Sequence, residues 1–344
     1  MHHDAPDSYL DAIRLQPTLL RHALDAPDPF ATAAARRLLG AIDRVVLTGM
    51  GGSNHSGWPL HLRFAARGVE SWHFEMSELL GHGWPVVRPG TLLVVVSHSG
   101  ASGEVLELLE RVPSTGARLV AVVNDEQSPL ARAADIVAPL WCGTPNTAFT
   151  GTGGFANGAL VLHRLGDALL GGSVTAELAS SPDAMTDLLD RSPALLGELR
   201  EAHLDRTVLF ALARGASLTA ARGGALVVKE SAKTPIEAMG SAEFRHGPLE
   251  LADGALRTFV LAGIGEDRVL NARLAQDVLD RGGAVTWIDH VDGPGQNLTL
   301  PEVPAAARPL LEFTLMQLVS VAAAGRRGIE PGRLRHISQV TTVR

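Results

Sequence analysis

The sequence has few of the features that mark secreted, membrane-spanning or nucleic-acid-binding proteins. Its 344 residues include one cysteine, Cys142, so the chain can form no internal disulfide. The formal net charge is −7 and Lys and Arg form no run, which argues against a nucleic-acid partner. Residues 1–14 contain no apolar signal segment. We therefore expect a cytoplasmic protein that binds neither nucleic acid nor membrane.

Long hydrophobic runs are also missing. The most apolar segment, residues 309–325, is interrupted by Glu312 and Gln317 and is shorter than the ~20 residues that span a membrane. We expect it to be a buried helix. Among the 13 histidines, no H-x-x-x-H pair and no cluster with acidic residues has a spacing that suits a metal. No metal or cofactor is therefore expected, and no serine triad is recognisable.

Aromatic residues make up only 4% of the chain, whereas Ala, Gly and aliphatic residues are plentiful, as in layered α/β proteins. From residue 44 onward, short aliphatic runs alternate with segments of helical period, which predicts parallel strands joined by helical crossovers. We expect an α/β fold with two tandem doubly wound domains, each a mostly parallel sheet flanked by helices. Because 344 residues exceed one core of usual size, we place an N-terminal helix at 1–28, a first domain at 29–172 and a second at 190–344.

The elements predicted within these domains follow the same pattern. Strands are expected at residues 44–48, 72–74, 91–97, 119–123, 136–139, 207–212, 258–264 and 284–288. Helices are expected near residues 9–24, 53–66, 102–112, 128–134, 147–170, 217–232, 267–281 and 304–325.

An internal repeat supports the division into two copies of one fold. RVVLTGMGGS (44–53) is echoed by TVLFALARGAS (207–217), and each runs from a strand into a glycine loop before a helix. The echo fails at SHSGAS (97–102), where the second copy has AGIGED (262–267) with two acidic residues and no hydroxyl. Only the first copy is therefore expected to bind an anion.

The segment LLVVVSHSGASGE (92–104) predicts a phosphate site. An apolar strand runs into a loop with Ser97, Ser99 and Ser102, and the loop opens onto an amphipathic helix. The first N–H groups of a helix lack internal acceptors and favour an anion, and hydroxyls add further donors. The loop has no lysine, which favours a single phosphate ester over a triphosphate. In a purely structural alternative, Ser102 caps the helix while Ser97 and Ser99 are turn residues.

Two residues of the second copy are candidates for proton transfer. Glu230 falls in the last turn of the helix expected at 217–232, where the dipole disfavours a charged carboxylate and so favours a general base. His246 lies in EFRHGP (243–248), in a loop that Gly247 and Pro248 restrict, and is suited to relay a proton near neutral pH. Their structural alternatives are a surface glutamate paired with a neighbouring lysine and a hydrogen-bonded loop histidine.

A competing interpretation is a dinucleotide site. The loop GMGGSN (49–54) partly matches the dinucleotide fingerprint, and Glu75 lies near the distance expected for a ribose-binding acid. The third glycine is replaced by Asn54, however, and a dinucleotide would leave the hydroxyl loop at 97–102 unexplained. A nicotinamide-dependent oxidoreductase is therefore disfavoured.

Taken together, these motifs resemble the sugar isomerase (SIS) family, in particular the tandem-SIS isomerase half of glucosamine-6-phosphate synthase and its stand-alone relatives, the sugar-phosphate isomerases, deaminases and deglycases. The resemblance covers nearly the whole chain, including IRLQPTLL (13–20), VVNDEQSPLARAAD (122–135), CGTPNTAFTGT (142–152), ARGAS (213–217) and KES (229–231). It implies a substrate-binding set made up of Gly51, Gly52, Ser53, Ser97, His98, Ser99, Ser102 and Thr150, in which Ser53 and residues 97–102 bind the phosphate.

The resemblance also implies the reaction. Glu230 is similar to the base that moves a proton between C-1 and C-2, and His246 is similar to the histidine that opens the sugar ring from a neighbouring subunit, so a homodimer is expected. A hexose or aminohexose phosphate would be isomerised or deaminated through an enediol or enolamine. The amidotransferase half, with its N-terminal cysteine nucleophile, has no counterpart here, so we expect no release of ammonia from glutamine.

Two departures from the family leave a second function open. Gln339 stands where the family usually has a lysine able to form a Schiff base, and Val227 stands where it has another active-site lysine. A glutamine amide forms no iminium and a valine cannot neutralise an enediolate. The alternative is a protein that binds a sugar phosphate and no longer converts it.

Overall fold

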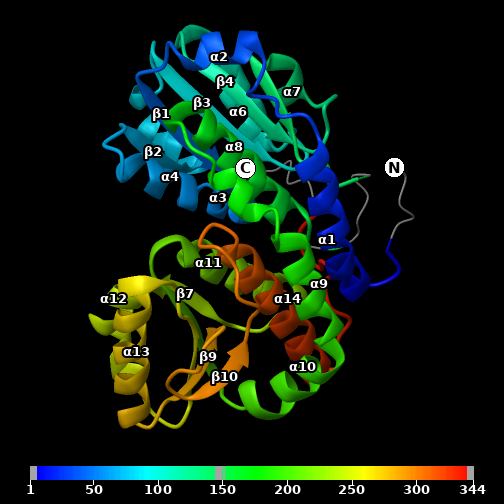
Figure 1. The fold of residues 1–344 in the computed structure, drawn as a ribbon, viewed down its shortest axis with the longest axis vertical. Helices are drawn as coiled ribbons and strands as arrows, with labels where there is room; N and C mark the ends of the chain where they lie inside the picture. Colours follow the sequence, from blue (N-terminus) through cyan, green and yellow to red (C-terminus); the bar gives the residue numbers. More distant parts are fainter. Residues whose placement is uncertain (1–5, 144–148, 150–151, 339–344) are drawn as a thin grey trace.

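The computed structural model describes residues 6–143, 149 and 152–338, which form two lobes, each around a five-stranded parallel sheet (Figure 1). The strand order in the first sheet is β2-β1-β3-β4-β5. Its strands are β1 (Arg44–Gly49), β2 (Ser71–Glu75), β3 (Thr91–Ser97), β4 (Arg118–Val123) and β5 (Ile136–Pro139). All five strands expected in this half of the chain are present.

The second sheet has the same topology. Read from β7, its order is β7-β6-β8-β9-β10, and all its strands are parallel. In each lobe the second strand therefore lies on one side of the first strand, and the third strand lies on its other side. Its strands are β6 (Val208–Ala213), β7 (Glu237–Gly240), β8 (Leu256–Leu261), β9 (Ala284–Asp289) and β10 (Gln296–Thr299). The parallel α/β prediction is confirmed, whereas the proposed domain boundaries stay a prediction.

Helices cover both faces of each sheet (Figure 1). They are α1 (Tyr9–Asp25), α2 (Ala33–Leu39), α3 (Gly51–His55), α4 (Trp58–Ala65), α5 (Met76–Glu78), α6 (Gly103–Arg111), α7 (Pro129–Ala133), α8 (Gly154–Leu170), α9 (Ser181–Asp190), α10 (Ser192–Glu198), α11 (Leu218–Ala232), α12 (Ser241–Arg245), α13 (Gly265–Asp280) and α14 (Arg308–Arg326).

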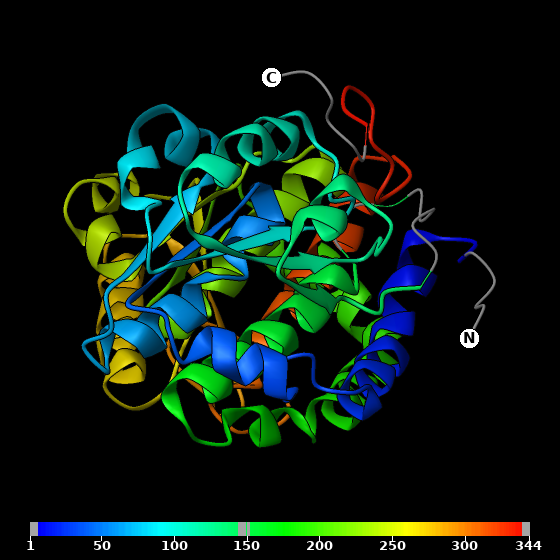
Figure 2. The same ribbon diagram turned by 90° about the horizontal axis from the view of Figure 1, so that it is seen from above.

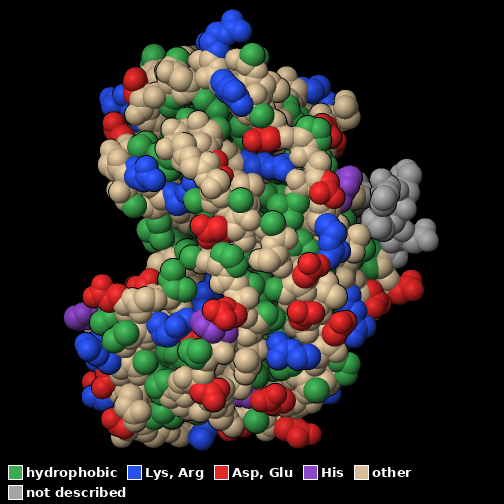
Figure 3. Space-filling model, in the orientation of Figure 1, with side chains coloured by type: hydrophobic (Ala, Val, Ile, Leu, Met, Phe, Trp, Pro, Cys, Tyr) green, Lys and Arg blue, Asp and Glu red, His purple; other side chains and the backbone are tan. Residues whose placement is uncertain are grey.

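Alternation along the strands assigns the two faces of the first sheet. Val45 and Leu47 pack with α4 and α8, whereas Val46, between them, packs with α5 and α6 on the opposite face. The strands are apolar at successive positions because both faces are covered, as is usual in parallel sheets. On the face drawn in Figure 3, basic and acidic side chains are interspersed over both lobes.

Helix α1 joins the two lobes. Ser8 caps it by accepting a hydrogen bond from Asp11 N, and its apolar stripe, with Tyr9, Ile13 and Leu20 buried, packs against α8, α9 and α14 (Figures 1 and 2). The sequence predicts this helix, and the structure shows that it contacts elements of both halves of the chain.

Helix α14 is the buried helix expected from the apolar segment, and both of its polar interruptions have partners. Arg308 Nε donates to Glu312 Oε1 at 2.8 Å, and Gln16 Nε2 of α1 donates to Gln317 Oε1 at 2.8 Å. Paired in this way, polar groups are tolerated in a core. No helix in the described part of the chain has both the length and the apolarity to cross a membrane.

Three predicted elements need correction. The single helix expected at 53–66 is two helices, α3 and α4, because the chain breaks at Ser56–Gly57 and restarts with Pro59 in the first turn. The helix expected at 147–170 begins at Gly154, after the described residues 152 and 153. The strand expected at 258–264 is β8 and ends at Leu261, since the chain turns at Gly263 with φ +73°.

Candidate functional site

The carboxyl ends of β1 and β3 lie side by side. After β1 the chain turns toward the face that α4 and α8 cover, and after β3 it turns toward the opposite face, which α6 covers. Gly49 of β1 pairs with Val96 of β3. No side chain fits at Gly49, because a Cβ there would lie 2.7 Å from Val96 O. Gly51 follows in the left-handed region, with φ +51°, and begins α3. In doubly wound sheets this crossing point is where ligands bind.

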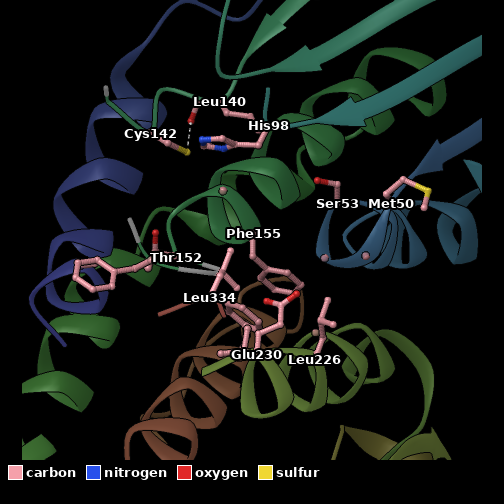
Figure 4. Close-up of a pocket in the computed structure, with 18 of the residues that line it drawn as sticks. Met50, Ser53, His98, Leu140, Cys142, Thr152, Phe155, Leu226, Glu230 and Leu334 are labelled. Carbon is pink, nitrogen blue, oxygen red and sulfur yellow. Dashed lines mark hydrogen bonds between the residues drawn. The ribbon is translucent and has the colours of Figure 1, made fainter. Parts of the chain in front are cut away.

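A pocket of about 400 Å³ opens at this point, between the two lobes. From the first lobe, Gly51, Gly52, Ser53 and His98 line it, and from the second lobe Glu230 does (Figure 4). The structure therefore brings together the glycine loop, the middle of the hydroxyl loop and the candidate base, which are far apart in the sequence.

The three hydroxyls of the 97–102 loop organise the loop itself. Ser97 Oγ accepts from Gly100 N at 3.1 Å, Ser99 Oγ accepts from Ala101 N at 3.4 Å, and Ser102 Oγ accepts from Val105 N at 3.4 Å. The capping alternative is thus present in the structure, and these three side chains are not among the lining of the pocket. A hydroxyl that accepts one N–H keeps its own O–H to donate, so capping and anion binding are compatible.

His98 is the residue of this loop that faces the pocket. Burial lowers its pKa below the ordinary 6.5, so the ring is neutral near pH 7. It lies against the start of α8, where a Cβ at Gly154 would be 3.5 Å from His98 Nδ1. A neutral imidazole offers one N–H donor to an anion and no full positive charge.

Glu230 lies in the last turn of α11, as predicted, and is half-buried. Figure 4 shows its carboxylate directed into the pocket, beside Leu226 and below Phe155. Val227, one turn earlier on the same helix, also lines the pocket and is 3% exposed. The wall of the pocket is therefore apolar at Val227.

Neither lysine of the sequence lines this pocket. Lys229 is exposed on α11. Lys233, in the left-handed region at φ 53°, ends α11, and its Nζ donates to the main-chain oxygens of Glu230 and Arg333. Burial lowers the pKa of Lys233, and nearby Arg335 lowers it further. Lys233 thus holds the C-terminal tail, the described residues 327–338 that follow α14, against the end of α11.

The tail forms one wall of the pocket. Gly332 N donates to Ser231 Oγ at 2.8 Å, and Arg333 forms an antiparallel bridge with Phe149 of the first lobe. Leu334, the next residue, lines the pocket. The tail is therefore attached to both lobes beside Glu230.

His246 lies apart from this pocket within one chain. It follows α12, is exposed, and its main-chain N donates to Glu243 O at 2.9 Å. It does not line the pocket. Two other residues named above, Thr150 and Gln339, lie outside the described residues.

Sequence reasoning missed the aromatic floor of the site. Phe155 of α8 and Phe313 of α14 stack across the lobes with ring centroids 4.0 Å apart and planes 18° apart. They pack over Gly223 of α11, where a Cβ would lie 3.1 Å from Phe313. The glycines of TGGFANG around Phe155 mark a place of close packing in the sequence. The residue on which Phe155 stacks, Phe313, is 158 residues further along the chain, so sequence spacing could not identify it.

Glu75, the candidate ribose-binding acid, has a structural role. It precedes α5, and its carboxylate accepts hydrogen bonds from Ser77 N at 3.2 Å and Ser77 Oγ at 2.7 Å. Glu75 does not line the pocket at the glycine loop, so the structure gives no support for a ribose-binding role of this residue.

In the second lobe, the corresponding place after β6 is occupied by a carboxylate of the protein itself. A Cβ at Gly215, which follows β6 with φ +55°, would lie 2.6 Å from Asp267 Oδ2. Asp267 is the last residue of AGIGED and stands where the first copy has Ser102. The Asp267 carboxylate lies beside the start of α11, which supports the expectation that only the first copy binds phosphate.

Comparison with known proteins shows what the chain is similar to. Residues 38–140 match the family model described as SIS domain. Over 326 residues the chain is 27% identical to glutamine–fructose-6-phosphate aminotransferase [isomerizing] of Bradyrhizobium diazoefficiens, covering 88% of this chain and 52% of that protein. The chain spans about half the length of the curated relatives it matches.

Solved structures show the same fold. The C-terminal domain of glucosamine-fructose-6-phosphate aminotransferase from Francisella tularensis has a TM-score of 0.85 at 20% identity, covering 96% of this chain and 98% of that chain. Glucosamine-6-phosphate deaminase from Thermotoga maritima has a TM-score of 0.73 at 20% identity, covering 97% and 99%.

Proposed function

Because residues 38–140 are a SIS domain and the chain is homologous to the isomerase half of the isomerizing aminotransferases, we propose that it binds a hexose or aminohexose phosphate and catalyses aldose–ketose isomerisation or deamination. One observation carries the proposal: Ser53 and His98 of the first lobe line the same pocket as Glu230 of the second. An anion held at one end then places the carbon chain beside a carboxylate.

The phosphate ester is bound at the β1–α3 and β3–α6 turns. Ser53, which lines the pocket, donates its O–H to a phosphate oxygen, with His98 and the main chain at Gly51 and Gly52 beside it. We assign Ser97, Ser99 and Ser102 as further O–H donors, although their side chains stand behind the pocket lining in the structure. Binding through a remote phosphate fixes the position of the reacting carbons, and that binding energy serves catalysis.

Glu230 transfers the proton in the chemical step. In the open-chain aldose it removes the proton from C-2; the electron pair forms the C-1–C-2 double bond, and the C-1 carbonyl oxygen takes up a proton to give the enediol. The proton then returns from Glu230 to C-1 while the 2-hydroxyl gives up its proton, so the C-2 carbonyl of the ketose forms. An amino group on C-2 gives an enolamine by the same transfer; protonation at C-1 then gives an imine at C-2, and water hydrolyses this imine to the ketose and ammonia. Thr150 belongs with the sugar-binding residues on the family pattern.

His246 opens the sugar ring from the neighbouring subunit in a cytoplasmic homodimer. Its exposure in the single chain supports this arrangement, because a residue that acts in a partner's pocket must be accessible on its own surface.

The experiment is turnover of aldose, ketose and amino-sugar phosphates, followed by NMR, for wild type and Glu230→Gln. We expect the variant to lose at least about 10³-fold in turnover and to keep its substrate affinity. Glu201→Gln, at an exposed glutamate outside the pocket, is the matched control. An active Glu230→Gln protein, or one that no longer binds ligand, refutes the assignment.

One observation favours a second function, a non-catalytic sugar-phosphate sensor. Val227 gives the pocket an apolar wall where the family has a lysine, and neither Lys229 nor Lys233 replaces it among the described lining. A sugar phosphate would then stabilise the fold by mass action without being consumed. A rise in melting temperature with a ligand that NMR shows to be unchanged, across the whole panel, identifies the sensor.

A further inference from the structure

The two parts of the proposed site lie on different lobes, and one contact between helices joins them. Helix α3 contributes Gly51 and Ser53 to the pocket, and α11 contributes Glu230. Figure 1 shows α3 on the side of the first lobe that faces α11, and the two helices are in contact. The position of α3 on α11 therefore sets the distance between a phosphate at Ser53 and the Glu230 carboxylate.

One side of α11 makes this contact and also carries the carboxylate. Four residues spaced by three or four positions lie along that side: Thr219, Arg222, Leu226 and Glu230. Thr219 Oγ1 donates to His55 O at the end of α3. At the start of α3, a Cβ at Gly51 would lie 3.4 Å from Leu226 Cδ2. Both ends of α3 are therefore in contact with α11.

Trp58 and Arg222 fasten the two lobes beside this contact. Trp58 is the first residue of α4, and its Nε1 donates to Gly215 O of the second lobe at 3.0 Å. The Arg222 guanidinium lies over the same indole, 5.5 Å from the ring centroid. A cation in this position is attracted by the electron-rich face of the ring. Two groups of the second lobe thus hold one side chain of the first.

Within the first lobe, the indole of Trp58 packs against histidines that reach α3. Its ring centroid lies 5.5 Å from that of His61 and 6.0 Å from that of His73. His73 Nε2 lies 2.7 Å from the main-chain oxygen of Asn54, which follows Ser53. Burial lowers the pKa of His73 to about 4, so the ring is neutral near pH 7 and has one N–H to donate. The indole is therefore connected to the residue next to Ser53.

Arg222 has no carboxylate partner in the part of the chain that the structure describes. Its side chain is half-buried. A cation that is partly removed from water is costly unless another group interacts with it. The Trp58 ring is the partner that the structure gives to this cation. The stack is therefore the interaction through which Arg222 acts on the contact between the lobes.

We propose that Arg222 is a positioning residue, which stacks on Trp58, fixes α3 against α11 and so sets the distance between the bound phosphate and Glu230. The inference rests on the proposed function. Arg222 itself does not line the pocket. Without the stack, Ser53 would still bind the phosphate in the first lobe, but the reacting carbons would be displaced from the carboxylate. A displacement of about 1 Å can cost about 100-fold in rate.

The experiment separates rate from affinity. The probe is a member of the panel above that the wild type converts, with fructose 6-phosphate and glucosamine 6-phosphate tested first. NMR gives kcat, and calorimetry in the Glu230→Gln background gives Kd without turnover. We expect Arg222→Met to lower kcat at least about tenfold and to change Kd less than about threefold. Arg273→Met, at an exposed arginine of α13 outside the pocket, is the matched control and should change neither.

Three further variants test whether the effect comes from the stack. Trp58→Leu should lower kcat at least as much as Arg222→Met. The double variant Arg222→Met/Trp58→Leu should be no slower than Trp58→Leu, because the contact is already lost in each single variant. Arg222→Lys should be at least about threefold faster than Arg222→Met, since an ammonium group is also attracted by an indole face.

The outcomes distinguish this inference from the function on which it rests. A wild-type kcat in Arg222→Met, or effects of the two single variants that multiply in the double variant, would show that the stack does not position the site. Equal losses of affinity and of kcat in Arg222→Met and Trp58→Leu would show that these residues support the fold alone, and would also overturn the inference. If the wild type converts no member of the panel, the proposed function fails and this inference fails with it.

Discussion

At the scale of single residues, the sequence shows which side chains can bind or react, but it does not show which groups those side chains contact. It predicts that Ser97, Ser99 and Ser102 share one loop, and the structure confirms the loop. It does not reveal that each hydroxyl accepts a main-chain N–H of that same loop. Whether a serine caps, binds a ligand or does both depends on which groups converge in space, and sequence spacing alone does not contain that information.

Buried ion pairs are likewise not predictable from the spacing of residues in the sequence. Nothing in the sequence connects Arg308 with Asp289, yet Arg308 Nη2 donates to Asp289 Oδ1 at 2.8 Å, and both side chains are nearly inaccessible. Arg308 also neutralises Glu312 across one turn of α14. A charge in such a place is tolerated only while it is paired.

Arg308→Met should therefore be strongly destabilising. It leaves the buried Glu312 without its cation and removes one of the two arginines that pair with Asp289, the other being Arg268. We expect the free energy of unfolding to fall by about 3 kcal/mol or more. Urea denaturation measures this change. Arg21→Met, which breaks the exposed Arg21–Asp183 pair (2.6 Å), is the control and should cost less than about 1 kcal/mol. Equal losses in the two variants would contradict the account of this network.

At the scale of elements, long periodic segments are predicted well and short ones poorly. Helix α11 follows from its apolar pattern and from Thr234–Pro235, which ends it, and Glu230 falls in its last turn as expected. Strands β7 and β10 have four residues each and lie at sheet edges. Such strands carry too few residues for a clear alternation, so the second sheet is incomplete in the prediction.

The junction of α3, α4 and β2 contains histidines that have to stay neutral. Burial, with a smaller contribution from the nearby Arg222 guanidinium, lowers the pKa of His55 and of His73 from 6.5 to about 4. His73 Nε2 lies 2.7 Å from Asn54 O, and its ring stacks with that of His61 at 6.2 Å. Protonation here would bury positive charge beside Arg222.

This arrangement predicts a loss of stability in acid. Above pH 6.5 these histidines are neutral in both states and contribute no pH dependence. As the pH falls from 6.5 to about 4, the unfolded chain binds protons that the folded chain does not, so the free energy of unfolding decreases by up to about 3 kcal/mol for each histidine. Urea denaturation between pH 7.5 and 4.5 measures the slope.

His73→Gln should reduce that slope, because one titrating group is removed while a donor for Asn54 O is kept. His82→Gln, at an exposed histidine, is the control and should leave the slope as in wild type. An unchanged slope in His73→Gln would show that this histidine does not stay neutral on folding.

At the scale of the whole molecule, the repeat correctly predicts two similar lobes, and the two sheets have the same strand order. The pocket between them was beyond prediction. It combines residues 50–53 and 98 with α11 and the tail, and their proximity depends on how α1, α8, α11 and α14 pack together. Contacts of such sequence separation leave no local pattern.

The role proposed for His246 requires two subunits and gives a complementation test. Glu230→Gln and His246→Asn are each expected to be inactive alone. After subunit exchange, a mixed dimer has one pocket with both residues intact, so random mixing should restore about a quarter of wild-type activity. Mixing Glu230→Gln with the double variant Glu230→Gln/His246→Asn is the control and should restore none. No recovery in the first mixture would contradict a histidine supplied by the partner.

The central claim is that the turns after β1 and β3 bind a phosphate ester. The most direct measurement is the Kd of glucosamine 6-phosphate for wild type and for the Ser97→Ala/Ser99→Ala/Ser102→Ala variant. Thr32→Ala, which removes the hydroxyl cap of α2 remote from the pocket, controls for the loss of a helix cap. The account predicts at least about a 100-fold loss of affinity in the triple variant, since hydrogen bonds to a charged group are removed, and none in the control. An unchanged Kd in a folded triple variant would contradict it.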